Sequence, residues 1–175
     1  MLFKETEIEG AWLVDLHRIG DERGYFARAW CAKEFEDHGI SSKLTQANLS
    51  YSMQSGTLRG MHYQVEPNSE MKAVRCIRGA LFDVIIDLRP ESKTYKKWIG
   101  YELNEENNLM LVVPEECAHG FLTLHDKSEA FYLVSAPYDP DSERGLRWDD
   151  PSFNIKWTFN PIEISHKDKS WSNYE

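Results

Sequence analysis

Apolar and polar residues alternate along most of the chain, in short runs that are separated by turns. The clearest case lies in residues 73–87, where two alternating runs flank Arg78-Gly79. A period of two on both sides of a glycine predicts two β-strands joined by a tight turn. The same pattern predicts further strands in residues 11–16, 25–30, 44–51, 57–64, 98–103, 109–113, 120–124 and 130–135.

Helical and irregular segments take up less of the sequence. Residues 32–38 have a helical composition and end at Gly39, which is typical of a helix C-cap. Beyond Pro137, further prolines interrupt a segment of little periodicity, and we expect it to wrap back onto the body. The many short strands at close spacing predict an all-β fold, an antiparallel jelly-roll barrel with a few short helices. We expect residues 1–175 to form a single domain.

Composition and charge narrow the classes of function. A formal net charge of −9 argues against a nucleic-acid binder that works by bulk electrostatics. The three cysteines form no CxxC motif, so we expect reduced thiols, as in the cytoplasm. No apolar run approaches the ~18 residues of a membrane helix, and the N-terminus lacks the apolar stretch of a signal peptide. The expectation is a soluble cytoplasmic protein.

Ionisable residues stand inside strands that are otherwise apolar. His62 lies in the predicted strand 57–64, while Lys72 and Asp83 lie at or within the central pair of strands. Such residues are either paired at the surface or line a pocket. Lys72 shares its parity with Val74 and Cys76, and alternation alone does not decide which face it occupies.

Two segments resemble the paired motifs of the cupin superfamily, a group of small jelly-roll barrels. They are residues 60–79, which begin GMH, and residues 114–120, PEECAHG. Metal-binding cupins usually supply three histidines and a glutamate from these segments. Here Gln64 and Lys72 stand where ligands would be expected, which leaves only His62 and His119. Two histidines are too few for a stable transition-metal site, so we expect no bound metal.

Nine motifs in one order narrow the resemblance to a single family. They are DERGYF (21–26), QANLS (46–50), LRGMHYQ (58–64), MKAVRCIRG (71–79), FDVIIDLR (82–89), ESKTY (91–95), PEECAHGF (114–121), WDDPSFNIKW (148–157) and ISHKD (164–168). Together they closely resemble the dTDP-4-dehydrorhamnose 3,5-epimerase family. Ala47 and Leu133 depart from the Asp and Lys common in that family, which bears on fine substrate preference.

The resemblance implies proton removal and return at C3 and C5 of dTDP-4-dehydro-6-deoxy-D-glucose, through an enolate. This reaction belongs to dTDP-rhamnose and cell-surface polysaccharide synthesis and needs no cofactor. A base, an acid and a cation for the enolate oxygen are required. The resemblance assigns them to His62, Tyr132 and Lys72, with Asp168 as the partner of His62. Imidazole, with an unperturbed pKa near ~6.5, suits the base.

Each of these residues also has a structural interpretation. His62 could be a strand histidine bonded to the backbone, Lys72 a solvated edge lysine, and Tyr132 a core aromatic. Asp83 is expected either to pair with Lys72 and hold it charged or to form a plain cross-strand ion pair.

The family resemblance also implies a set of substrate contacts and a partner. The expected contacts are Arg23, Phe26, Gln46, Asn48, Arg59, Asp83, His119, Tyr138 and Arg147. Arg23 and Arg59 are expected at the diphosphate, because a guanidinium forks onto phosphate oxygens. In the family the DERGYF segment tends to complete the neighbouring subunit's site, which implies a homodimer.

Other functions remain open from the sequence alone. The first alternative is a single-site 3- or 5-epimerase of another nucleotide-linked 4-keto-6-deoxysugar. The others are a metal-dependent cupin oxygenase or isomerase and a non-catalytic sugar-binding cupin. Deuterium uptake at C3 alone would favour the single-site epimerase. A stoichiometric bound metal would favour the oxygenase or isomerase, and the absence of turnover would favour the sugar-binding cupin.

Overall fold

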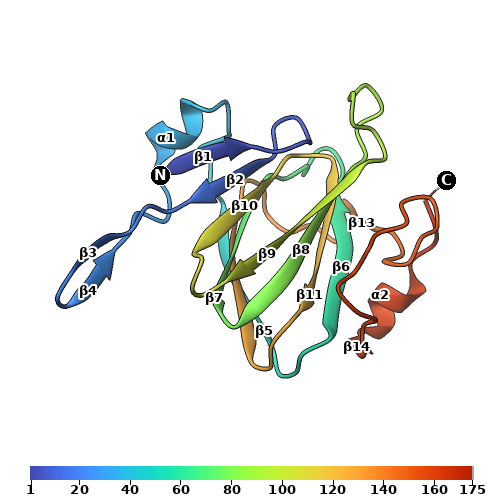
Figure 1. The fold of residues 1–175 in the computed structure, drawn as a ribbon. Helices are drawn as coiled ribbons and strands as arrows, with labels where there is room; N and C mark the ends of the chain where they lie inside the picture. Colours follow the sequence, from blue (N-terminus) through green and yellow to red (C-terminus); the bar gives the residue numbers. More distant parts are fainter. Residues whose placement is uncertain (175) are drawn as a thin grey trace.

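Two antiparallel sheets face each other and enclose the core of the molecule. The computed structural model describes residues 1–174. One sheet has the order β1-β2-β10-β7-β12-β5, and the other has the order β13-β6-β11-β8-β9, with β14 in parallel pairing to β6 (Figure 1). This arrangement is a jelly-roll barrel, so the predicted fold class is confirmed.

The elements follow the predicted runs closely. The strands of the first sheet are β1 (Leu2–Glu5), β2 (Trp12–Asp15), β5 (Gln46–Ser52), β7 (Lys72–Arg78), β10 (Leu109–Val113) and β12 (Ser128–Val134). The second sheet holds β6 (Thr57–Gln64), β8 (Ala80–Asp87), β9 (Trp98–Asn104), β11 (Cys117–Thr123), β13 (Glu143–Gly145) and β14 (Glu163–Ile164). The remaining elements are β3 (Ile19–Asp21), β4 (Gly24–Phe26), α1 (Ala32–Glu36) and α2 (His166–Ser170).

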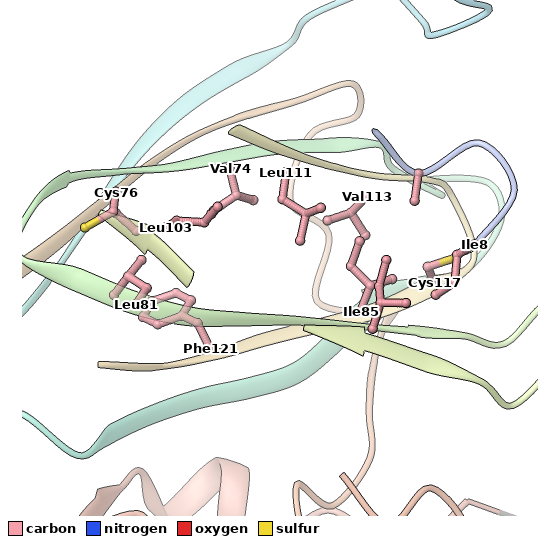
Figure 2. Packing of buried hydrophobic residues seen from close by; sticks show 13 residues of the cluster. Ile8, Val74, Cys76, Leu81, Ile85, Leu103, Leu111, Val113, Cys117 and Phe121 are labelled. Atoms are coloured by element: carbon pink, nitrogen blue, oxygen red, sulfur yellow. The ribbon is translucent and has the colours of Figure 1, made fainter. Parts of the chain in front are cut away.

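The barrel core consists of side chains from the inward faces of both sheets. Figure 2 shows Val74, Leu111 and Val113 of one sheet facing Leu81, Ile85 and Phe121 of the other. These positions alternate with outward-facing residues along each strand, as period-two patterning requires. Polar side chains that share the inward parity of these residues must therefore lie inside the barrel.

Segments outside the barrel cover the outer faces of both sheets. Phe35 of α1 packs on the first sheet with Val14 and Met110. Leu146 and Phe153, from the irregular C-terminal segment, pack on the second sheet. That segment also adds β13 and β14 to the edge of β6 that faces away from β11, one at each end of β6 (Figure 1).

One predicted strand differs from the observed elements, and several short strands were not predicted. The strand predicted over residues 25–30 ends at Phe26 and pairs with β3 to form a hairpin that projects from the barrel (Figure 1). Beyond Phe26 the chain turns back to the body, where Ala27 and Trp30 pack around α1. β1, β3, β13 and β14 were not expected, because these short segments carry little alternation and depend on neighbouring strands for pairing.

Candidate active site

An irregularity in β6 brings Arg59 and His62 onto the same interior face. The two residues are three apart, so strict alternation would place them on opposite faces. In the pairing with β11, however, His62 lies opposite His119 and Arg59 lies opposite Phe121. Three steps on β6 therefore match two on β11, which is the pattern of a β-bulge.

Gly60 makes this bulge possible. Its φ is +127°, and a Cβ at this position would fall 2.5 Å from Gly120 Cα on β11. Only glycine combines that backbone conformation with such a close approach of two strands. The bulge also leaves Gly60 N free to donate 3.3 Å to Asp168 Oδ2, which ties β6 to the C-terminal segment.

His62 and Asp168 form a short hydrogen-bonded pair. Asp168 Oδ1 lies 2.6 Å from His62 Nε2, and the Asp168 side chain is almost fully buried. Asp168 is held in α2, where its backbone N–H donates to the N-cap residue Ser165. The predicted pair is thus present in the structure.

The charge state of Asp168 defines the tautomer of His62. Burial alone would raise the pKa of Asp168, but hydrogen bonds from His62, Gly60 and Ser165 lower it below its ordinary value. An ionised carboxylate can only accept, so Nε2 donates the proton. The lone pair of a neutral His62 ring is then on Nδ1, which can accept a proton from elsewhere.

Lys72 is buried inside the barrel and does not lie at a solvated edge. Its Nζ lies 3.2 Å from Glu70 Oε1 and 3.5 Å from the main-chain oxygen of His62. The expected pair between Lys72 and Asp83 is not formed. Asp83 Oδ1 instead lies 2.9 Å from His119 Nε2, because the register of β8 and β11 brings these side chains together on the inward face.

Asp83 is completely buried, with 0% of its side chain exposed. Its second oxygen, Oδ2, has no hydrogen-bond partner among residues 1–174. A buried acceptor without a partner is costly. This oxygen is therefore an unsatisfied acceptor in the interior of the barrel.

Tyr132 occupies the sheet opposite His62. It lies between Asn48 on β5 and Val74 on β7 in the strand register, and it packs against the barrel core. Its pKa is raised, first by burial and then by the charge of Glu70, while Arg59 acts in the opposite direction. The phenol therefore keeps its proton at neutral pH.

A cavity of about 420 Å³ opens beside His62. Its lining includes Thr57, Leu58, Arg59, His62, Glu163, Ser165, Lys167 and Asp168. The Arg59 guanidinium at this opening donates to the main-chain oxygen of Tyr51 at 2.9 Å and to Ser52 Oγ at 3.2 Å. These bonds hold an exposed cation where an anionic ligand could reach it.

Gln46 and Tyr138 lie together near the end of β5. Gln46 Oε1 accepts from Tyr138 N at 3.0 Å, and the Tyr138 hydroxyl donates to Glu143 Oε2 at 3.0 Å. Glu143 also pairs with Lys167, which lines the cavity. This group connects Tyr138 with the cavity that contains His62.

Of the predicted site residues, Arg59, His62 and Asp168 line this cavity, and three of the others lie outside the barrel. Arg23 and Phe26 lie on the projecting β3–β4 hairpin, where the Arg23 guanidinium pairs with Asp21 (Figure 1). Arg147 lies outside the barrel and pairs with Asp149. For these residues the sequence motifs gave no information about distance from the cavity.

Several residues of the site were not predicted from the sequence. Glu70 shares the parity of Lys72, and this spacing could have revealed it. Glu143, Lys167 and Trp171 come from the C-terminal segment, which has no periodicity to place them. Trp171 packs edge-on to His62, with ring centroids 6.4 Å apart.

Two general features of the described chain bear on the class of protein. Within residues 1–174, histidines, cysteines and carboxylates do not gather in groups of three that could hold a metal ion. Across the same residues, no helix has the length and apolarity needed to cross a membrane.

Comparison with known proteins gives a consistent result over nearly the whole chain. The family model described as dTDP-4-dehydrorhamnose 3,5-epimerase matches residues 5–175. A dTDP-4-dehydrorhamnose 3,5-epimerase of Sinorhizobium fredii is 44% identical over 97% of this chain and 88% of that protein. The solved structure of such an epimerase from Bacillus anthracis, with TDP and PPi bound, has a TM-score of 0.95 at 36% identity and 99% coverage of both chains.

A relative with a narrower name also matches. The dTDP-4-dehydrorhamnose 3-epimerase of Streptomyces niveus is 36% identical over 97% of this chain and 82% of that protein. Similarity of this kind therefore extends to proteins named for one sugar carbon as well as for two.

Proposed function

Because the chain belongs to the dTDP-4-dehydrorhamnose 3,5-epimerase family, we propose that it converts dTDP-4-dehydro-6-deoxy-D-glucose to dTDP-4-dehydro-L-rhamnose. The reaction inverts C3 and C5 of the sugar. The C4 ketone makes the hydrogens on these carbons acidic, since the carbanion that forms is an enolate. The protein must supply a base on one face of the ring, an acid on the other and positive charge near the ketone oxygen.

The observation that carries the proposal is the His62–Asp168 pair at the cavity. With Nε2 donating to an ionised carboxylate, Nδ1 of His62 is the base. Asp168 keeps the ring in this tautomer and stabilises the imidazolium that forms. One C–H bond of the sugar breaks, and its proton moves to His62.

Lys72 and Tyr132 complete the proposed chemistry from the facing sheet. The Lys72 ammonium stabilises the enolate oxygen. Tyr132 then delivers its hydroxyl proton to the opposite face of the same carbon, which forms the new C–H bond and leaves a phenolate. Proton exchange with water returns His62 to the neutral imidazole and Tyr132 to the neutral phenol. The protonated state of Tyr132 at neutral pH supports its role as the acid.

The other predicted contacts are proposed to bind the substrate. Arg59 stands at the cavity opening and takes the diphosphate. Asp83, through its unpaired Oδ2, and its partner His119 bind a sugar hydroxyl or the ketone. Gln46, Asn48 and Tyr138 lie toward one end of β5, where they contact the sugar or the base.

We further propose a homodimer in which the β3–β4 hairpin reaches the partner's cavity. Its Phe26 is 64% exposed, and Ile19 is equally open. The outer face of the first sheet also exposes Leu49 and Ile77. Exposed apolar patches of this kind are typical of protein interfaces. In the dimer, Arg23 and Phe26 would contribute to the neighbouring site. All three cysteines are free thiols, which supports a cytoplasmic location.

The test is incubation with the 4-keto substrate in deuterated water, followed by proton NMR of the product. Because the proton delivered to each inverted carbon exchanges with solvent, deuterium is expected at both C3 and C5. Uptake at C3 alone would assign the narrower activity, for which the Streptomyces niveus relative is named. Tight binding of dTDP without any exchange would overturn the enzymatic proposal.

A further inference from the structure

Glu70 stands beside Lys72 on the inward face of the barrel. Glu70 lies in the loop before β7, two residues ahead of Lys72, which is the first residue of that strand. Glu70 Oε1 lies 3.2 Å from Lys72 Nζ, and each side chain is only 10% exposed. This is the one acidic group among residues 1–174 that forms an ion pair with Lys72.

A buried ammonium needs such a partner, because burial of an unpaired charge is expensive. The other contact of Lys72 Nζ is the main-chain oxygen of His62, at 3.5 Å. The Lys72 head group is therefore held between Glu70 on one side and the strand that carries His62 on the other. Without Glu70, the Lys72 ammonium would have no ion-pair partner among residues 1–174.

Glu70 also acts on Tyr132 through its charge. Together with burial, it raises the pKa of the phenol, and Arg59 on β6 opposes it. The other ionisable groups inside the barrel include Lys72, His62 and the Asp83–His119 pair, together with the buried thiols of Cys76 and Cys117. Glu70 thus adjoins the enolate-stabilising cation and influences the acid of the proposed reaction.

We propose that Glu70 is a positioning residue for this reaction. It fixes the Lys72 ammonium where the enolate oxygen forms. This proposal rests on the proposed epimerase function. It predicts that Glu70 affects kcat and its pH dependence, while nucleotide binding does not depend on it.

The experiment compares Glu70→Gln, Glu70→Asp and Glu70→Ala with Glu66→Gln. Glu66 is an exposed carboxylate in the same loop, so its substitution removes the same charge without touching the interior. Turnover would be followed from pH 6 to 10 and dTDP affinity by calorimetry. The Tyr132 phenol would be titrated by NMR with ¹³C-labelled tyrosine, assigned with Tyr132→Phe.

In Glu70→Gln and Glu70→Ala, we expect kcat to fall up to about 10²-fold, the size of effect that follows displacement of a catalytic group. The dTDP affinity should stay within about twofold, Glu70→Asp should recover part of the loss, and the titration of Tyr132 should move to lower pH. Glu66→Gln should resemble the parent. Unchanged kcat and an unmoved Tyr132 titration in Glu70→Gln would overturn the proposal. The NMR titration needs no turnover, so it distinguishes this failure from failure of the epimerase function.

Discussion

Asp168 Oδ1 lies 2.6 Å from His62 Nε2, although 106 residues separate them in the chain. The carboxylate also accepts from the Gly60 N–H, and the backbone N–H of Asp168 donates to the N-cap residue Ser165 of α2. The proposed base is therefore oriented by a segment that is remote in sequence but folded against β6.

Substitution Asp168→Asn tests this relationship. The amide keeps the size of the side chain but loses the charge that orients His62 and stabilises its protonated form. We expect kcat to fall on the order of 10²- to 10⁴-fold, the usual contribution of general acid–base catalysis, with little change in dTDP affinity. Asp149→Asn is the matched control, because Asp149 pairs with Arg147 at the surface. An active Asp168→Asn enzyme would contradict the role of the pair.

Substitution Tyr132→Phe separates proton removal from proton delivery. The variant lacks the hydroxyl that would protonate the opposite face, while His62 and Lys72 remain. In deuterated water, we expect exchange at the sugar carbons to exceed inversion, because the base can return a proton to the face it came from. The His62→Ala variant should lose both exchange and inversion. Proton NMR measures exchange and inversion in the same sample. Normal inversion by Tyr132→Phe would remove Tyr132 from the mechanism.

Mixed dimers test whether the β3–β4 hairpin serves the neighbouring site. His62→Asn and Arg23→Ala should each have low activity when pure. In a mixed dimer, the hairpin of the His62→Asn chain would meet the intact His62 of the other chain and restore one complete site. We expect activity to recover after the two variants are unfolded together and refolded. If each β3–β4 hairpin served the site of its own chain, the mixture would show only the average activity of the two pure variants.

Substitution Gly60→Ala should disrupt the bulge that presents Arg59 and His62. The new Cβ would meet Gly120 Cα at 2.5 Å, and alanine at φ +127° is strained. We expect a loss of about 2–5 kcal/mol in the free energy of unfolding, measured with urea. Gly39→Ala is the control, since Gly39 has φ +70° but no atom within 4 Å of its Cβ position. Its loss should be about 1 kcal/mol. Equal losses in the two variants would show that close packing at Gly60 is unimportant.

Asp87 should make stability depend on acid pH. Burial opposes its ionisation, but hydrogen bonds from Arg89, Ser92 and Thr94 outweigh burial and hold the pKa of Asp87 well below its ordinary value. A lowered pKa in the folded state stabilises the fold above the unfolded value, near ~3.9, and this stabilisation is lost as pH falls below it.

Asp87→Asn should therefore cost about 1–3 kcal/mol at pH 7 and much less at pH 2–3. Urea unfolding at the two pH values measures the difference. Glu91→Gln, in the loop that follows Asp87, should leave the free energy of unfolding of the parent protein unchanged at both pH values. The same cost at both pH values would mean that shape, and not charge, makes Asp87 important.

Much of the fold could be read from local patterns, because a strand with one buried face must alternate. This reasoning placed the central strands, but it did not decide the face of Lys72, and Tyr132 was assigned from the family resemblance. It could not identify partners. Asp83 was expected beside Lys72 but pairs with His119, since the register of β8 and β11 determines which inward side chains meet.

The sequence by itself determined the all-β class, the positions of the longer strands and, through its motifs, the family. Only the tertiary structure decided that Arg59 and His62 share one face, that Asp83 pairs with His119, and that Arg23 lies far from the cavity of its own chain. The physical reason is that alternation is a local property of a strand. Bulges, strand register and the path of an irregular segment are instead determined by packing between residues that are distant in the chain.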